Sequence, residues 1–156
     1  MKILVGLDDS VFSRHAIEYV SRVRWPAGSR ILVVSVLASA GGAGADDGAT
    51  RAQAREALIA KAGQRTREAG LPTETRVLEG EPGHSLVAAA QSERCDLIVV
   101  GSRGRSRLAQ LLLGSTAHHV VTHAHCSVLV VKGDGRPQAR PLEESARAVS
   151  QAEAHR

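Results

Sequence analysis

The sequence predicts one α/β domain built on an open, mostly parallel β-sheet with helices on both faces. Short runs rich in β-branched residues are nearly all apolar, as expected for strands covered on both faces. Segments with helical periodicity lie between these runs, which implies right-handed crossovers. The chain has 156 residues and is 43% hydrophobic, enough for one sizeable core. Ligands of such sheets bind beyond the carboxyl ends of the strands, so we expect a site in the segments that directly follow the strands.

The expected strands differ in how far they alternate between polar and apolar residues. Four of them are almost continuously apolar: Ile3 to Leu7, Ile31 to Val36, Leu97 to Val100 and Val128 to Val131. Thr73 to Leu78 alternates, which suits a strand at the edge of the sheet.

Four helices are expected between the strands, each marked by a start or a stop signal. The first follows Ser10 or Asp9 as cap and ends near Trp25-Pro26; the second runs from about Ala54 to Ala69 and stops at Gly70; the third runs from Pro82 to Glu93; the fourth has Ser115 as its cap and ends near Ala124.

Two segments lack apolar periodicity. Ser39 to Ala49 consists mainly of Gly, Ala and Asp, and we expect a mobile loop there. Gly133 to Pro141 resembles a linker, so we expect a domain over 1–132 and a disordered or weakly helical tail over 133–156.

Charge and composition exclude several function classes. The formal charge is +4, but acids and bases are interleaved, which favours a solvated Arg-rich surface over a nucleic-acid interface. Aromatic residues make up 2% of the chain, so platforms for stacking bases are largely missing. The apolar runs are far shorter than the ~20 residues of a membrane span. Two cysteines make no disulfide framework and no leader opens the sequence, so we expect a cytoplasmic protein.

The chemistry is concentrated after the strand that ends at Val100. Gly101-Ser102-Arg103-Gly104 is followed by nine residues and then by Gly114-Ser115-Thr116. The first two glycines let the backbone turn close to a ligand. The second group opens a helix, where free N–H groups and the positive end of the dipole favour phosphate. Neither a Walker sequence nor a Gly-x-Gly-x-x-Gly fingerprint occurs, so this is a phosphate cradle of a third kind.

A carboxylate stands at the end of the first strand, in Gly6-Leu7-Asp8-Asp9-Ser10. Asp8 is placed to accept ribose hydroxyls or to hold a magnesium ion that bridges phosphates. The alternative is that Asp8 only caps the first helix.

These motifs together resemble the universal stress protein family. The match covers about Met1 to Lys132 and is almost continuous over Asp96 to Ser106 and over Leu111 to Ser115. The resemblance implies a Rossmann-like, adenine nucleotide alpha hydrolase-like sheet in the order 3-2-1-4-5, and a homodimer joined through Val128 to Val131. Family members often carry prolines near the positions of His125 and Ser127, and this chain has neither. The resemblance therefore does not predict the shape of the loop before the last strand.

The resemblance also implies a ligand, ATP with Mg²⁺, and the residues that hold it. Leu7, Asp8 and Val36 would surround the adenosine. The site we infer comprises Leu7, Asp8, Ser10, Val36, Gly101, Ser102, Arg103, Gly104, Gly114, Ser115 and Thr116, with Asp8 as the metal-binding residue. Hydrolysis needs an oriented water and a base, and the sequence offers only Asp8 near the phosphates, which leaves slow turnover or autophosphorylation on Ser115 or Thr116 open.

Three functions remain open from sequence. The leading one is a nucleotide-dependent switch in the stress response, acting on an unidentified protein partner. A nucleotide-free dimeric scaffold keeps the fold without the ligand. An adenylating ATP-pyrophosphatase matches only in Asp9-Ser10. A metal site at His119 and His123 and a disulfide between Cys95 and Cys126 are minor alternatives.

Overall fold

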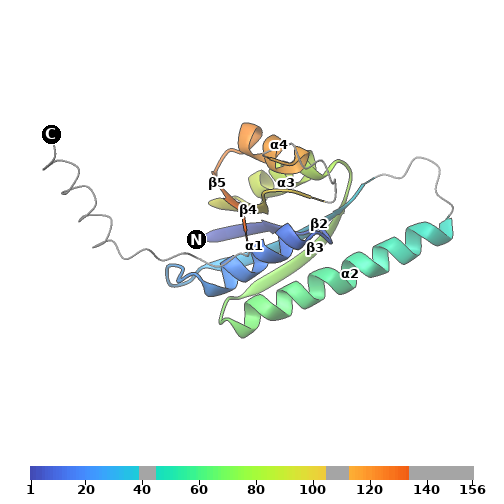
Figure 1. The fold of residues 1–156 in the computed structure, drawn as a ribbon. Coiled ribbons are helices and arrows are strands. Elements are labelled where there is room, and N and C mark those ends of the chain that lie inside the picture. Colours follow the sequence, from blue (N-terminus) through green and yellow to red (C-terminus); the bar gives the residue numbers. More distant parts are fainter. Residues whose placement is uncertain (39–44, 105–112, 134–156) are drawn as a thin grey trace, which may run out of the picture.

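Five strands form one parallel sheet in the order β3-β2-β1-β4-β5 in the computed structural model, which describes residues 1–38, 45–104 and 113–133 (Figure 1). This confirms the predicted fold class and strand order. The strands are β1 (Lys2–Gly6), β2 (Arg30–Leu37), β3 (Thr73–Glu79), β4 (Leu97–Gly101) and β5 (Ser127–Val131).

Helices cover both faces of the sheet, as Figure 1 shows. The helices α1 (Val11–Arg22) and α2 (Ala45–Glu68) lie on one face; α3 (Pro82–Ser92) and α4 (Ser115–His123) lie on the other. Each pair closes a separate core. Ile17 and Ile59 pack with Val99 on the first face, whereas Leu86 and Val120 pack with the other side chains of the second. The strands are nearly all apolar because both of their faces are buried.

The strand order reverses at β1, which pairs with β2 on one side and with β4 on the other. After β1 the chain goes outward to β2 and β3, and it returns on the opposite side to form β4 and β5. The carboxyl ends of β1 and β4 therefore diverge at a topological switch point, where open α/β sheets bind their ligands. The alternating β3 lies at one edge, as its sequence predicts.

Two local predictions were wrong. The loop expected over Ser39 to Ala49 is helical from Ala45 onward, and residues 39–44 lie outside the described part of the chain. Alanine favours the helix strongly, so the chain forms a helix here without an apolar period. Ser115 is the first residue of α4 and does not cap it, because Gly114 holds the extended N-cap conformation.

The tail predicted over 133–156 lies almost wholly outside the described residues, which end at Gly133. Within the described ranges, no helix has the length and apolar character that crossing a bilayer requires.

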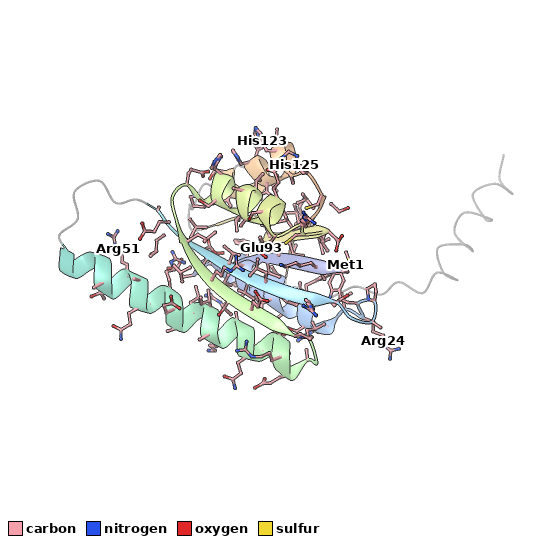
Figure 2. The ribbon with its side chains drawn as sticks, turned by 180° about the vertical axis from the view of Figure 1, so that it is seen from behind. Met1, Arg24, Arg51, Glu93, His123 and His125 are labelled. Atoms are coloured by element: carbon pink, nitrogen blue, oxygen red, sulfur yellow. The ribbon has the colours of Figure 1, made fainter. Side chains whose placement is uncertain are left out.

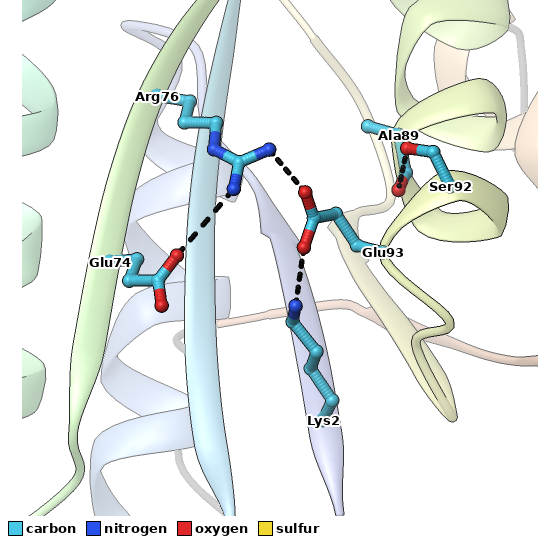
Figure 3. Close-up of polar contacts among 6 residues, drawn as sticks. All are labelled: Lys2, Glu74, Arg76, Ala89, Ser92 and Glu93. Atoms are coloured by element: carbon cyan, nitrogen blue, oxygen red, sulfur yellow. Dashed lines mark hydrogen bonds and ion pairs between the residues drawn. The ribbon is translucent and has the colours of Figure 1, made fainter.

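A network of charges spans the face of the sheet between the end of α3 and the strands β1 and β3 (Figure 3). Glu93, the C-cap residue of α3, accepts from Lys2 Nζ at 2.5 Å and is also paired with Arg76. Arg76 also approaches Glu74 at 3.6 Å. The hydrogen bond from Lys2, followed by that from Arg76, lowers the pKa of the Glu93 carboxyl. Glu93 therefore ties a helix end to two strands that are not neighbours.

We expect Glu93→Gln to lower the urea midpoint of unfolding at pH 7. The pKa of Glu93 is lowered in the folded state, so its ion pairs stabilise the protein above the ordinary pKa of a free glutamate, and this contribution is lost as the pH falls. The difference from the parent protein should therefore shrink between pH 7 and pH 3. Glu74→Gln is the control, because its side chain is 64% exposed and makes only the longer contact. An equal deficit at both pH values would contradict the role assigned to the Glu93 charge.

Candidate functional site

A cavity of about 300 Å³ opens at the carboxyl ends of β1, β2 and β4. Its volume lies at the lower end of the range of small-molecule pockets. One wall is apolar and the other carries the glycines and hydroxyls of β4 and α4. The lining residues are Gly6, Leu7, Asp8, Val34, Val36, Ala38, Arg55, Pro82, Leu86, Val100, Gly101, Arg103, Gly104, Ser115, Thr116 and Ala117.

Asp8 is held by the first turn of α1. Its Oδ1 accepts hydrogen bonds from the backbone N–H of Ser10, at 3.0 Å, and from the Ser10 hydroxyl. The same hydroxyl accepts from the N–H of Ser13 at 3.1 Å, so Ser10 caps the helix and orients the carboxylate at once. Oδ2 faces Gly104, lying 3.1 Å from where a Cβ on that glycine would stand. Asp8 thus keeps one oxygen directed at the cavity.

The turn after β4 is fixed by backbone hydrogen bonds. The N–H of Gly114 donates to the carbonyl of Ser102 at 2.8 Å, which brings the start of α4 against the glycine turn. The N–H of Ser102 donates to the carbonyl of Val131 at 2.9 Å, so the same turn is joined to the end of β5. A Cβ on Gly114 would lie 3.2 Å from Arg103 Cα and from Gly104 N. Glycine is needed at 114 because the two backbone segments approach so closely.

The first turn of α4 lies at the wall of the cavity and has backbone N–H groups without a side-chain cap. The first groups of any helix have no acceptor within the helix. Gly114 has no side chain to accept them, and the first helical bond runs from the N–H of His118 to the Gly114 carbonyl. Ser115, Thr116 and Ala117 line the cavity. The positive end of the helix dipole and these N–H groups together favour an anion.

Most of the residues predicted from the sequence come together here. Eight line the cavity directly: Leu7, Asp8, Val36, Gly101, Arg103, Gly104, Ser115 and Thr116. The other three support it, since Ser10 orients Asp8, Ser102 is buried and anchors the turn, and Gly114 caps α4.

The predicted site did not include the residues on the far walls of the cavity. Gly6, Val34, Ala38, Arg55, Pro82, Leu86, Val100 and Ala117 complete the lining. Gly6, Val34 and Val100 lie on predicted strand ends and were open to inference from the topology. Nothing in the sequence marked Arg55 as a site residue, because an arginine in a helix rich in charged residues is normally exposed to solvent.

Arg103 lies within the glycine turn, Gly101 to Gly104, and has its guanidinium carbon 5.9 Å from the centre of the Phe12 ring. This contact holds the arginine at the start of α1 while the side chain still lines the cavity. The other arginines of the turn, at 105 and 107, lie outside the described residues.

The minor alternatives find little support. The rings of His119 and His123 stack at 4.2 Å, and among the described residues no group of three metal-binding side chains could hold an ion. Cys95 and Cys126 are free thiols. Burial raises the pKa of the Cys95 thiol to about 11 and raises that of Cys126, which disfavours the reactive thiolate.

Comparisons with known proteins agree on one family. The model of the universal stress protein family matches residues 1–132. Universal stress protein MJ0531 of Methanocaldococcus jannaschii is 46% identical over 65 residues, which are 42% of this chain and 38% of that protein. The alignment thus spans well under half the length of that relative.

Solved structures of the same family share the fold. A universal stress protein in complex with cAMP has a TM-score of 0.68 and 26% identity, over 85% of this chain and 97% of that one. The universal stress protein of Archaeoglobus fulgidus in complex with dAMP has a TM-score of 0.63 and 25% identity, over 85% and 98%. Rossmann-like topology is common to all three chains.

We expect Gly101→Ala to destabilise the fold. A Cβ at this position would lie 2.6 Å from the backbone carbon of Phe12, so α1 would have to move away from β4. Overpacking of this kind costs about 1–3 kcal/mol, measurable as a lower urea midpoint. Gly104→Ala is the matched control, since among the described residues its Cβ would approach only Asp8 Oδ2, and we expect it to change stability by less than about 1 kcal/mol. Equal urea midpoints for the two variants would show that the close approach to Phe12 does not cause the loss of stability.

Proposed function

The chain belongs to the universal stress protein family, and from that premise we propose that it binds ATP with Mg²⁺ in the cavity at the carboxyl edge of β1 and β4. The observation that carries the proposal is that the uncapped first turn of α4 lines the same cavity as Asp8, whose Oδ2 faces Gly104. One can accept hydroxyl groups and the other can donate to phosphate, which are the two recognition needs of a nucleotide.

The two ends of the cavity suit the two ends of a nucleotide. Leu7 and Val36 are buried and form an apolar wall on the side of β1 and β2, which suits the adenosine. Gly104, Ser115 and Thr116 lie on the other side with Arg103, which suits the phosphate chain. Relatives with cAMP and dAMP bound support an adenine nucleotide as the ligand class.

The donor set fits magnesium held mainly by the ligand. Mg²⁺ in nucleotide sites keeps several waters and is bound by phosphates and by one or two carboxylates. Asp8 supplies one such carboxylate through Oδ2. When bound, the ion would neutralise phosphate charge. Among the described residues that line this cavity, Asp8 supplies the one carboxylate.

We further propose that occupancy acts as a switch in a cytoplasmic homodimer joined through β5. The glycine turn is joined to β5 by the bond from Ser102 to Val131, so ordering of the turn by phosphate has a direct route to this strand. β5 lies at the edge of the sheet, and edge strands carry unpaired backbone groups that can pair with a second chain. Val128, Leu129 and Val130 are only partly buried there.

Thermal unfolding with millimolar Mg-ATP tests the ligand. A ligand at ~100 times its dissociation constant stabilises the native state by ~2.7 kcal/mol, which raises the midpoint by roughly 5 to 10 °C in a domain of this size. We expect this rise to be lost in Asp8→Asn and in Gly114→Ala, each compared with its own ligand-free midpoint. Glu74→Gln, remote from the cavity, should keep the rise. No rise in the parent protein, purified free of nucleotide, would favour the dimeric scaffold.

The proposed dimer is tested by sedimentation. We expect Val128→Lys to convert the dimer to a monomer, because a charge on β5 would be buried when two edges pair. Val11→Lys places the same change at a position that is 45% exposed on α1, and it should leave the mass unchanged. A dimer that persists in Val128→Lys, or a parent protein that is already monomeric, would contradict the role of β5.

A further inference from the structure

A second cavity of about 240 Å³ adjoins the first at the end of β2. It is lined by Asp9, Leu37, Ala38, Arg51, Ala54, Arg55 and Leu58. Ala38 and Arg55 line both cavities, so the arginine stands at their junction. Figure 2 shows Arg51, one turn earlier on α2, at the end of the molecule opposite Met1 and Arg24, which is the carboxyl edge of the strands.

Arg55 has a buried donor that lacks an acceptor among the residues the structure describes. Its Nη1 is shielded from solvent and has no hydrogen-bond partner within that part of the chain. Burying a donor without a partner is costly, more so when the group is charged. Such a group is rare in a folded protein and calls for an explanation, of which an absent ligand is one. Because Arg55 lines the cavity of the proposed nucleotide site, an acceptor on the ligand would satisfy it.

The location of Arg55 determines which end of a bound nucleotide this side chain would contact. Ala38 directly follows β2, whereas the phosphate cradle follows β4 and opens α4. The strand β1 lies between β2 and β4, and neighbouring strands are ~4.8 Å apart, so the two ends of the cavity are separated by about 9–10 Å. With phosphates at the cradle, Arg55 lies at the nucleoside end.

We propose that Arg55 is a ligand-binding residue that donates a hydrogen bond to an acceptor atom of the purine ring. The inference rests on the proposed nucleotide site and adds a contact on α2 to it. A guanidinium carries donors only, so it pairs with a ring nitrogen and not with the exocyclic amino group of adenine. Its contribution is therefore independent of the number of phosphates.

Calorimetric titration with adenosine, AMP and Mg-ATP tests the contact. We expect Arg55→Met to weaken all three ligands by the same factor, about 10-fold or more, as for a hydrogen bond to a charged group. Gly114→Ala should weaken Mg-ATP much more than adenosine. Arg51→Met is the control, because Arg51 lines only the second cavity, and it should change each affinity less than about 3-fold.

The free protein gives a second readout. Without ligand, Arg55→Met should be at least as stable as the parent, because the substitution removes an unsatisfied buried donor and keeps an unbranched side chain of similar length. Unchanged affinities in Arg55→Met would contradict the proposed contact with the purine ring while leaving the nucleotide site intact. A loss of affinity that grows from adenosine to Mg-ATP would place Arg55 at the phosphates and would also contradict that contact. Failure of the parent protein to bind any of the three would overturn the proposed function and this inference with it.

Discussion

The pairing of β1 with β2 on one side and with β4 on the other is the constraint on which the rest of the structure depends. β1 runs through the centre of the sheet, where Ile3, Leu4 and Val5 are fully buried against both cores. Because the chain crosses in opposite directions from this strand, the ends of β1 and β4 separate, and Asp8 emerges at the gap. The bond from Ser10 to Asp8 then turns one carboxylate oxygen away from α1. A loss of register in β1 would remove the carboxylate, the apolar wall and the glycine turn from one another.

Burial explains why the strands could be predicted and parts of α2 could not. β1, β2 and β4 are buried on both faces, and continuous apolar runs identify such strands in a sequence. The start of α2 carries no apolar period, so a reading based on periodicity places a loop there. The same limit applies to Arg55, whose role arises from its place between two cavities and not from its neighbours in sequence. Ser10 was predicted to belong to the site, and the structure gives it a supporting position through Asp8.

The cavity is polarised along the edge of the sheet. Free backbone N–H groups and Arg103 gather where α4 begins, whereas Leu7 and Val36 form a buried apolar wall toward β2. A ligand with a charged and a neutral end therefore has one favoured orientation. The hydrogen bond from the N–H of Ser102 to the carbonyl of Val131 joins the charged end to β5, and it is the route that the proposed switch would use.

The most direct test of the nucleotide site is a titration of ¹⁵N-labelled protein with Mg-ATP, followed by backbone amide resonances. If the phosphates bind at the start of α4, the largest shifts occur at the amides of Gly104 and of Ser115 to Ala117, because these N–H groups would donate to the phosphates. Adenosine alone should leave those amides nearly unmoved while shifting the resonances of Leu7 and Val36. Shifts confined to other parts of the chain, or no shifts at millimolar Mg-ATP, would contradict the account.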